Sequence, residues 1–513
     1  MSTTPSPDDI CKAVRNQLRT YRSSSVAEVA LVLLHRRFSS VDAEMQSAPW
    51  LILSMVKWVL QDALAKDVGP PIRPDGFLSL QRRLWNMGDP AQMPPLGNLH
   101  RFVRSLAYVQ LEFQRPETFE FTRWPGLLDR LPSDNPARAQ FEAATGLTPA
   151  DFLDLAWAIY APVLGGKNPL GAKDFEPLRK AYGEKIDVII GLLSRDLQGL
   201  RQELLSDASL GRRTGANLLF EAPSFRRFPF IRSASGLHFC WHKRVLARGL
   251  DEFVHHKLAG SGDTYASPYA RVFEKYVVEL AKNTGLPSLE EREYLSRFGG
   301  NKRAVEVILH DDRCNILIEA KFGVYQDEYM TLDDARFANA KLGKLRSGVS
   351  QAADVSWRLS LADDLHPWTE REHDFVLLVT NRQLYIPTGR QLELISSPTS
   401  NEIDERARLE TTEKLAVDNV FILSLEEYER LMTEVADGRV QLSDVLRNVS
   451  KSVAETQGFT MDAGQLLARY GPMRNISPLV QSTVEASMVR VCKALGQEYD
   501  PSREPWRSIH ASN

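Results

Sequence analysis

Cysteine is scarce in this chain of 513 residues, which has only Cys11, Cys240, Cys314 and Cys492. The four lie far apart and form no Cys-x-x-Cys pair. This spacing argues against a disulfide framework and against a zinc site built from cysteines. A reducing cytoplasm is therefore the expected compartment.

Long apolar runs are also missing. The most apolar stretch, residues 48–65, contains Lys57, Gln61 and Asp62, which predicts a buried or amphipathic helix and not a membrane span. The first ten residues are polar and acidic, which does not fit a secretory signal. We therefore expect no membrane association.

An excess of charge of one sign is absent as well. The chain has 63 basic and 66 acidic residues, a net charge of -3, which neither favours nor excludes a nucleic-acid partner because a local basic groove can lie within a neutral total. The patterns G-x-x-x-x-G-K-[ST], H-E-x-x-H, G-x-S-x-G and G-x-G-x-x-G do not occur. Their absence argues against Walker-type nucleotide hydrolysis.

The order of periodic segments predicts three regions. Residues 1–225 have mainly helical spacing of apolar residues, for example in 25–37, 49–65, 99–113, 152–160 and 185–205. This region contains no recognisable catalytic signature. Residues 226–432 mix helices and strands, and residues 433–513 return to helical sequence. We expect the helical regions to bind substrate, a partner protein or a second copy of the chain.

The middle region predicts a small mixed α/β unit. Helices are expected over 245–255, 269–284, 332–342 and 350–361, and from Ser424, which forms a capping-box pattern with Glu427. Apolar runs at 303–309, 316–321, 375–380 and 419–423 predict strands. The polar residues 310–315 favour a hairpin between the first two of these strands.

Three charged residues in this hairpin indicate chemistry. Glu319 and Lys321 are two residues apart on one strand, so their side chains share a face of the sheet. Glu306 and Glu319 are equally far from the point between Asp312 and Arg313, which places them almost opposite each other. Two facing carboxylates repel unless a cation lies between them, and two carboxylates with water suit Mg²⁺.

Such a group suits phosphodiester hydrolysis. A metal ion held by Glu306 and Glu319 would polarise a phosphate and lower the pKa of bound water. Lys321 would position that water or stabilise developing negative charge. Glu274, on the preceding helix, is a further candidate acidic ligand.

The same segments resemble the PD-(D/E)XK nuclease superfamily, which has the restriction-endonuclease-like fold. The helix YARVFEKYVVEL, with Glu274, resembles the first core helix of the family, and Glu306 stands where its aspartate is expected. ILIEAK resembles the E-x-K strand, with Glu319 and Lys321, and GVSQAADVSWRL resembles the helix that carries a glutamine, here Gln351. The resemblance covers residues 230–430. It implies an α+β or α/β core with a mixed sheet, and metal-dependent cleavage of DNA or, less often, RNA.

The chain departs from the family pattern in three places, one of which is Val305 where the family name has proline. Glutamate replaces the usual aspartate at Glu306, and His310, Asp311 or Asp312 are alternative acidic-strand candidates. An acidic stretch at 326–334 follows the E-x-K strand and is interpreted as an inserted helix that could gate the site.

A second candidate surface is the segment 225–232, which alternates aromatic and basic residues. Arg226, Arg227 and Arg232 suit contacts with phosphates, and the aromatic residues suit stacking on bases. A seam between domains is the alternative interpretation of the same composition.

The sequence thus predicts a cytoplasmic, prokaryotic nuclease that uses Mg²⁺ or Mn²⁺, prefers DNA over RNA and acts in defence against phage or plasmid DNA. Two alternatives stay open. One is a catalytically inactive nuclease-fold subunit that binds nucleic acid or scaffolds a larger complex. The other is an interaction protein that acts through its helical N-terminal region.

Overall fold

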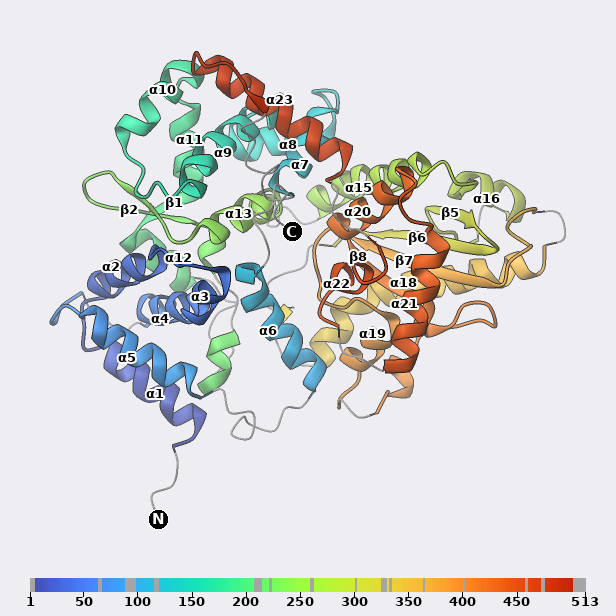
Figure 1. Cartoon of the computed structure of the whole chain (residues 1–513), viewed down its shortest axis with the longest axis horizontal. Helices are drawn as coiled ribbons and strands as arrows, with labels where there is room; N and C mark the ends of the chain where they lie inside the picture. The colour runs from blue at the N-terminus through green and yellow to red at the C-terminus, as the bar shows by residue number, and fades with distance from the viewer. Residues whose placement is uncertain are drawn as a thin grey trace. The chain divides into compact units, whose positions relative to one another are not determined.

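A computed structural model describes residues 5–62, 67–87, 98–114, 120–206, 215–220, 224–258, 263–299, 302–323, 330–331, 335–362, 365–399, 402–456, 460–471 and 476–501. The chain divides into two compact units (Figure 1). The first contains residues 1–96, 108–260 and 482–507, and the second contains residues 97–107 and 261–481.

The first unit is mainly helical and has a small sheet of three short strands in the order β1-β2-β3. Its elements are α1 (Pro7–Leu18), α2 (Ser23–Leu34), α3 (Val41–Gln46), α4 (Pro49–Gln61), α5 (Pro74–Trp85), α7 (Arg123–Asp129), α8 (Pro136–Thr145), α9 (Pro149–Leu164), α10 (Ala172–Tyr182), α11 (Lys185–Leu193), β1 (Ser194–Asp196), α12 (Leu197–Ser206), β2 (Phe230–Arg232), β3 (His238–Cys240), α13 (Lys243–Asp251), α14 (Phe253–Leu258) and most of α23 (Pro478–Ala494).

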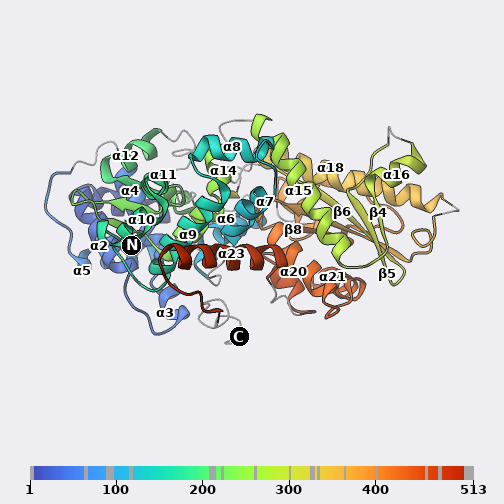
Figure 2. The same cartoon turned by 90° about the horizontal axis from the view of Figure 1, so that it is seen from above.

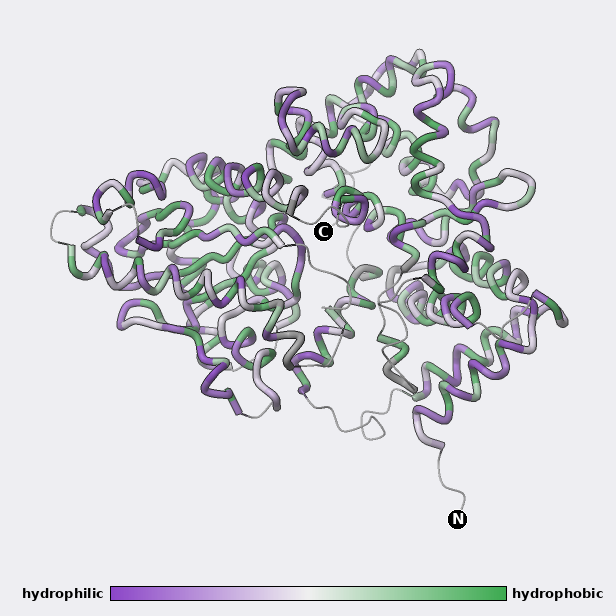
Figure 3. Tube along the Cα trace, turned by 180° about the vertical axis from the view of Figure 1, so that it is seen from behind, coloured by the Kyte–Doolittle hydropathy of each residue, from purple (hydrophilic) through white to green (hydrophobic). Residues whose placement is uncertain are grey.

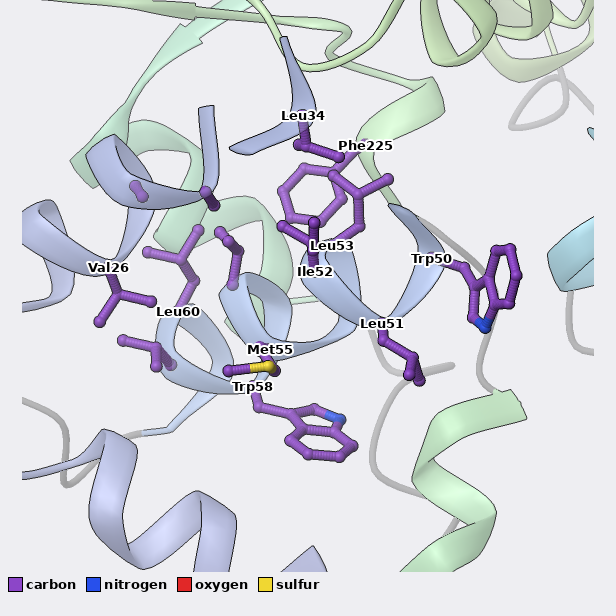
Figure 4. Packing of buried hydrophobic residues seen from close by; sticks show 14 of the residues in the cluster. Val26, Leu34, Trp50, Leu51, Ile52, Leu53, Met55, Trp58, Leu60 and Phe225 are labelled. Atoms are coloured by element: carbon purple, nitrogen blue, oxygen red, sulfur yellow. The ribbon is translucent and has the colours of Figure 1, made fainter. Parts of the chain in front are cut away.

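Helix α4 lies in the core of the first unit. Nearly all of its side chains are buried, among them Trp50, Ile52 and Trp58, and they pack against residues such as Val26 and Phe225 (Figure 4). A helix that is apolar around its whole circumference belongs in the interior of a domain. The prediction of a buried helix here is confirmed, and within the described ranges every helix is too short or too polar to serve as a transmembrane span.

The second unit is a mixed α+β structure around a five-stranded sheet. Its elements are α15 (Asp263–Asn283), β4 (Ser288–Glu290), α16 (Glu291–Phe298), β5 (Val307–Asp311), β6 (Cys314–Lys321), α18 (Ala335–Ser360), β7 (His373–Thr380), α19 (Gly389–Ser396), β8 (Val420–Ser424), α20 (Leu425–Ala436), α21 (Leu442–Thr456) and α22 (Ala463–Leu467). The range of α6 (Leu99–Gln114) crosses the division between the units at Ala107.

The strand order in this sheet is β4-β5-β6-β7-β8. The pairs β4–β5 and β5–β6 are antiparallel, whereas β6–β7 and β7–β8 are parallel (Figures 1 and 2). The central strands are mostly hydrophobic (Figure 3), and all residues of β8 are buried. Strands that are buried on both faces need such continuous apolar sequence.

Helices cover both faces of the sheet. Phe322 packs against Tyr265 and Phe273 of α15, with ring centroids 5.8 and 6.1 Å apart. Lys321, the preceding residue, instead points towards Gly348 of α18. Because successive side chains of an extended chain point to opposite faces, α15 and α18 lie on opposite sides of the sheet.

The β5–β6 hairpin has the expected register. Val307 pairs with Ile318 and Asp311 pairs with Cys314, so the turn consists of Asp312 and Arg313. Both turn residues have left-handed backbone angles, with φ of 40° and 61°. Two-residue turns with this geometry match the twist of paired strands.

Some elements differ from the sequence-based prediction. The strand expected over 303–309 begins only at Val307, because the carbonyls of Arg303 and Ala304 accept hydrogen bonds from Arg358 and Gln351 of α18 instead of joining the sheet. The helices expected over 332–342 and 350–361 are one continuous helix, α18. The helix expected over 185–205 is interrupted by β1, which pairs with β2.

The compact units do not follow the boundaries expected at 225 and 432. Residues 226–260 belong to the first unit, where α13 packs on α9. Residues 433–481 belong to the second unit, whereas residues 482–507 belong to the first. In the first unit, Arg490 and Ser487 of α23 donate hydrogen bonds to Asp154 of α9 over 2.7 to 3.1 Å.

A buried ion pair fixes α18 beside β7. The side chains of Arg371 and Asp374 are 2% and 0% exposed, their Nε and Oδ1 atoms lie 2.7 Å apart, and Arg371 also donates to the carbonyl of Ser356.

Removal of one partner of this ion pair leaves a buried charge without compensation. We expect Asp374→Ala to lower the free energy of unfolding by about 3–5 kcal/mol, measured by urea denaturation. Glu290→Ala, which breaks an exposed pair with Lys282, should cost less than about 1 kcal/mol, and equal losses would contradict this account.

Candidate active site

The hairpin register brings two carboxylates together. Glu306 directly precedes the pair Val307–Ile318, so the next position across the hairpin is Glu319. Opposite residues of an antiparallel pair have side chains on the same face of the sheet. The expected placement of Glu306 opposite Glu319 therefore holds, although Glu306 lies one residue outside β5.

Lys321 and Gln351 join Glu319 on this face. The Lys321 ammonium forms an ion pair with Glu319 Oε1, and Lys321 Nζ donates to Gln351 Oε1 over 2.7 Å. Gln351 Nε2 in turn donates to the carbonyl of Ala304 over 3.4 Å. A chain of contacts therefore runs from β6 through α18 to the segment that carries Glu306.

Glycine at position 348 allows this close approach. A Cβ atom there would lie 2.9 Å from Lys321 Cε, 2.9 Å from Leu378 Cδ2 and 3.4 Å from Glu319 Cγ. The helix therefore lies directly against the two site residues. The sequence pattern does not indicate a role for Gly348, because that role follows from the packing of α18 on β6 and β7.

Burial and mutual repulsion oppose ionisation of the two carboxyls. Burial, followed by repulsion from Glu319, raises the pKa of Glu306 to about 8. Burial also raises the pKa of Glu319 to about 7, against the opposing effect of Lys321. A carboxyl group in such a place either keeps its proton or is ionised beside a cation.

Glu274 and Glu291 complete the acidic surroundings. Glu274 on α15 has a pKa raised by burial and then by the charge of Glu291, and the charge of Glu274 in turn raises the pKa of Glu306. Glu291 is exposed at the first position of α16, and its backbone N–H donates to the carbonyl of Glu306 over 3.1 Å. Glu291 was not predicted from the sequence, because its position follows from the pairing of Glu290 with Val307 in a strand of only three residues.

The alternative acidic-strand candidates lie at the other end of the hairpin. His310 Nδ1 is 3.0 Å from Asn315 Oδ1. Asp311 accepts from the backbone N–H of Ser443 over 2.7 Å, and Asp312 pairs with Arg447 over 2.6 Å. His310 therefore bonds within the hairpin, and Asp311 and Asp312 attach the hairpin to α21, so these residues do not take the place of Glu306.

The basic residues proposed for nucleic-acid contact belong to the first unit. The expectation for Arg226 is corrected, because its side chain is only 4% exposed and its Nη1 donates to the hydroxyl of Tyr108 over 2.7 Å and lies 3.4 Å from Glu252. Arg227 and Arg232 are exposed, and Arg232 lies 3.5 Å from Asp196. The compact unit that contains these arginines does not contain Glu306.

The acidic stretch at 326–334 lies outside the described residues except for Met330 and Thr331. Both are buried, and the carbonyl of Thr331 accepts from Ser105 of α6 over 3.1 Å. The expected gating helix therefore stays a prediction.

The donor set fits a metal ion held by few protein ligands. No three histidine, cysteine, aspartate or glutamate side chains in the described part of the chain are grouped closely enough to hold a metal by themselves. Glu306 and Glu319 are two opposed carboxylates whose ionisation burial disfavours. Mg²⁺ commonly takes one or two protein carboxylates and completes its shell with water and substrate phosphate. The pair therefore suits Mg²⁺ or Mn²⁺ better than a metal that needs a full protein cage.

The raised pKa of Glu306 gives a pH dependence of stability. Its folded value of about 8 exceeds its unfolded value near 4.5, so the folded protein binds the proton more tightly. Without divalent metal, we expect the contribution of Glu306 to the free energy of unfolding to be fully present below pH 4.5 and to be lost as pH rises through about 8. Urea denaturation in EDTA at several pH values should show a smaller fall for Glu306→Gln. An identical pH profile in the variant would contradict the assignment.

The chain matches no family model, no curated protein and no solved structure.

Proposed function

We propose that the second unit is a metal-dependent nuclease of the PD-(D/E)XK type, which hydrolyses phosphodiester bonds with Mg²⁺ or Mn²⁺. The observation that carries the proposal is the register of the β5–β6 hairpin, which puts Glu306 opposite Glu319, with Lys321 on the same face of the sheet and held by Gln351. The mixed sheet, with an antiparallel hairpin followed by α18 and the parallel strand β7, also supports it.

Glu306 and Glu319 would hold the cation, and Glu274 and Glu291 would bind water in its outer shell. When bound, the cation supplies positive charge for the phosphate oxygens and lowers the pKa of a water molecule. Glu319 is 3% exposed, so its carboxylate is little screened by water and attracts a cation strongly.

Lys321 would stabilise the negative charge that develops on the phosphate. Its ammonium is fixed between Glu319 Oε1 and Gln351 Oε1, so it needs little reorganisation during the reaction. Positive groups that are already oriented in a site with little water stabilise such charge best. Gln351 is a positioning residue in this account, because it touches Lys321 and the backbone before Glu306.

DNA is the proposed substrate in preference to RNA, and defence against foreign DNA in a prokaryotic cytoplasm is the proposed role. The four cysteines are all unpaired, as a reducing compartment favours. The first unit would serve to bind a partner or a second copy of the chain.

A second candidate is a nuclease-fold subunit that binds nucleic acid without cleaving it. Two observations favour it. Few candidate metal ligands surround Glu306 in the described part of the chain, and the raised pKa of the Glu306 carboxyl keeps it protonated at neutral pH when no cation is bound.

The test is incubation of the purified protein with supercoiled plasmid DNA and with structured RNA. Parallel reactions contain Mg²⁺, Mn²⁺ or EDTA. Cleavage of the plasmid that requires either metal supports the proposal, and cleavage of RNA alone would change the substrate class. Binding without cleavage in both metals would favour the inactive subunit.

A further inference from the structure

Lys344 lies on the side of α18 that faces the acidic site. Successive residues of a helix are about 100° apart around its axis, so Lys344 lies between Gly348 and Gln351, about 40° from the first and about 20° from the second. Gly348 lies against Lys321, and Gln351 accepts a hydrogen bond from Lys321 Nζ over 2.7 Å. The side chain of Lys344 therefore leaves the helix on the same side as these two site residues.

The end of β6 shows where the ammonium group of Lys344 lies. Lys344 Nζ donates to the carbonyl of Phe322, the residue after Lys321, over 3.4 Å. The next residue, Gly323, donates its backbone N–H to Asn381 Oδ1 over 3.0 Å, which holds this end of the strand in place. Lys344 is thus a second lysine at the C-terminal end of β6.

Unlike Lys321, Lys344 has no carboxylate partner in the described part of the chain. The ammonium of Lys321 is paired with Glu319, whereas Lys344 is exposed and contacts only a carbonyl. That contact is longer than the usual hydrogen-bond length of about 2.7–3.2 Å, and an ammonium has three N–H groups to donate. The charge of Lys344 is therefore available to a ligand, and phosphate is the group that an available lysine commonly binds.

The position of Lys344 indicates which phosphate it would meet. Gln351 donates to the carbonyl of Ala304, two residues before Glu306. At a rise of about 1.5 Å per residue, Lys344 lies about 10 Å along the helix axis from Gln351. Lys344 and the segment that carries Glu306 therefore lie at opposite ends of the site, with Lys321 between them. A phosphate bound at Lys344 is thus a different phosphate from the one at the proposed metal ion.

We propose that Lys344 binds a second backbone phosphate of the substrate, next to the phosphate that is cleaved. The inference rests on the proposed function and narrows its substrate class. A substrate that reaches both positions must carry successive phosphates, so the nuclease acts on a polynucleotide chain and not on a small molecule with one phosphodiester. A contact to phosphate carries no sequence information, so it adds affinity for every sequence alike.

The test is the salt dependence of DNA binding, measured by fluorescence anisotropy in Mg²⁺ in the non-cleaving background Glu319→Gln. The probes are a short labelled DNA duplex and one of its strands. We expect Lys344→Met to weaken binding of at least one probe by about tenfold, because one charged contact to a phosphate is lost. The slope of log affinity against log salt concentration should become shallower by about 0.7–0.9, because fewer counterions are released. Lys344→Arg should keep the slope.

Lys451→Met is the matched control, because Lys451 is 75% exposed in the same unit and lies beside Glu455. It should keep both the affinity and the slope. An unchanged slope in a folded Lys344→Met protein, with folding checked by circular dichroism, would overturn the inference, because a lysine that only holds the end of β6 releases no counterions. Absence of binding to both probes would overturn it as well.

Cleavage is measured separately with the otherwise unchanged chain in Mn²⁺, so that the two proposals can fail independently. Binding that depends on Lys344 without any cleavage would remove the proposed hydrolysis alone. Cleavage that requires metal, with an unchanged slope in Lys344→Met, would remove this inference alone.

Discussion

Replacement of Lys321 by methionine should lower the rate of nucleic-acid cleavage by about a hundredfold to a thousandfold, and Glu319→Gln should lower it at least as much. Lys321→Met keeps the length of the side chain but removes the charge that meets the phosphate. Glu319→Gln keeps the shape but removes a metal ligand. Single-turnover assays in Mn²⁺ at saturating metal measure both effects.

These losses must come from chemistry and not from unfolding. Burial raises the pKa of Glu319 more than the charge of Lys321 lowers it, so we expect the neutral side chain of Glu319→Gln to leave the free energy of unfolding at neutral pH little changed. Glu293→Gln and Lys451→Met are matched controls, because these side chains are 52% and 75% exposed, and both should retain activity. Full activity of Lys321→Met would remove Lys321 from the mechanism.

The second large effect is expected at Gly348. A methyl group at this position would lie 2.9 Å from both Lys321 Cε and Leu378 Cδ2, so these flexible side chains must move. We expect Gly348→Ala to reduce cleavage by about tenfold or more, because a small displacement of a positioned group has large effects on rate. Stability should change little, since the gain in helix propensity of about 1 kcal/mol offsets the local crowding.

Gly343 provides the matched control on the same helix. A Cβ atom there meets nothing within 4 Å. Gly343→Ala should therefore raise the free energy of unfolding by about 0.5–1 kcal/mol and leave activity unchanged. Equal activities of the two variants would show that contact between α18 and Lys321 is not required for cleavage.

The local part of the site was predictable from the sequence. A polar turn between two apolar runs fixes the hairpin, and the period of two along a strand then places Glu306, Glu319 and Lys321 on one face. The capping box of Ser424 and Glu427 was predictable for the same reason, since both partners lie within one helical turn, and Glu427 N donates to Ser424 Oγ over 3.3 Å.

Features that depend on distant contacts were not predictable. Strand β4 has three residues and exists through its pairing with β5, so Glu291 could not be placed beside Glu306. Gly348 interrupts a helical pattern in the sequence, yet α18 continues through it because the sheet lies against that point. Arg226 looked like a surface residue in its basic surroundings, but Tyr108 and Glu252 hold it inside the first unit.

Titration of Mn²⁺ into the protein by isothermal calorimetry tests the central claim most directly, because it requires neither a known substrate nor cleavage. Glu306 and Glu319 should both be needed for a saturable binding event near pH 8. We predict that Glu306→Gln and Glu319→Gln each weaken this binding by at least about tenfold, whereas Glu293→Gln binds as the unchanged chain does. Saturable binding that survives in both variants, or no saturable binding to the unchanged chain, would contradict the assignment of this pair as a metal site.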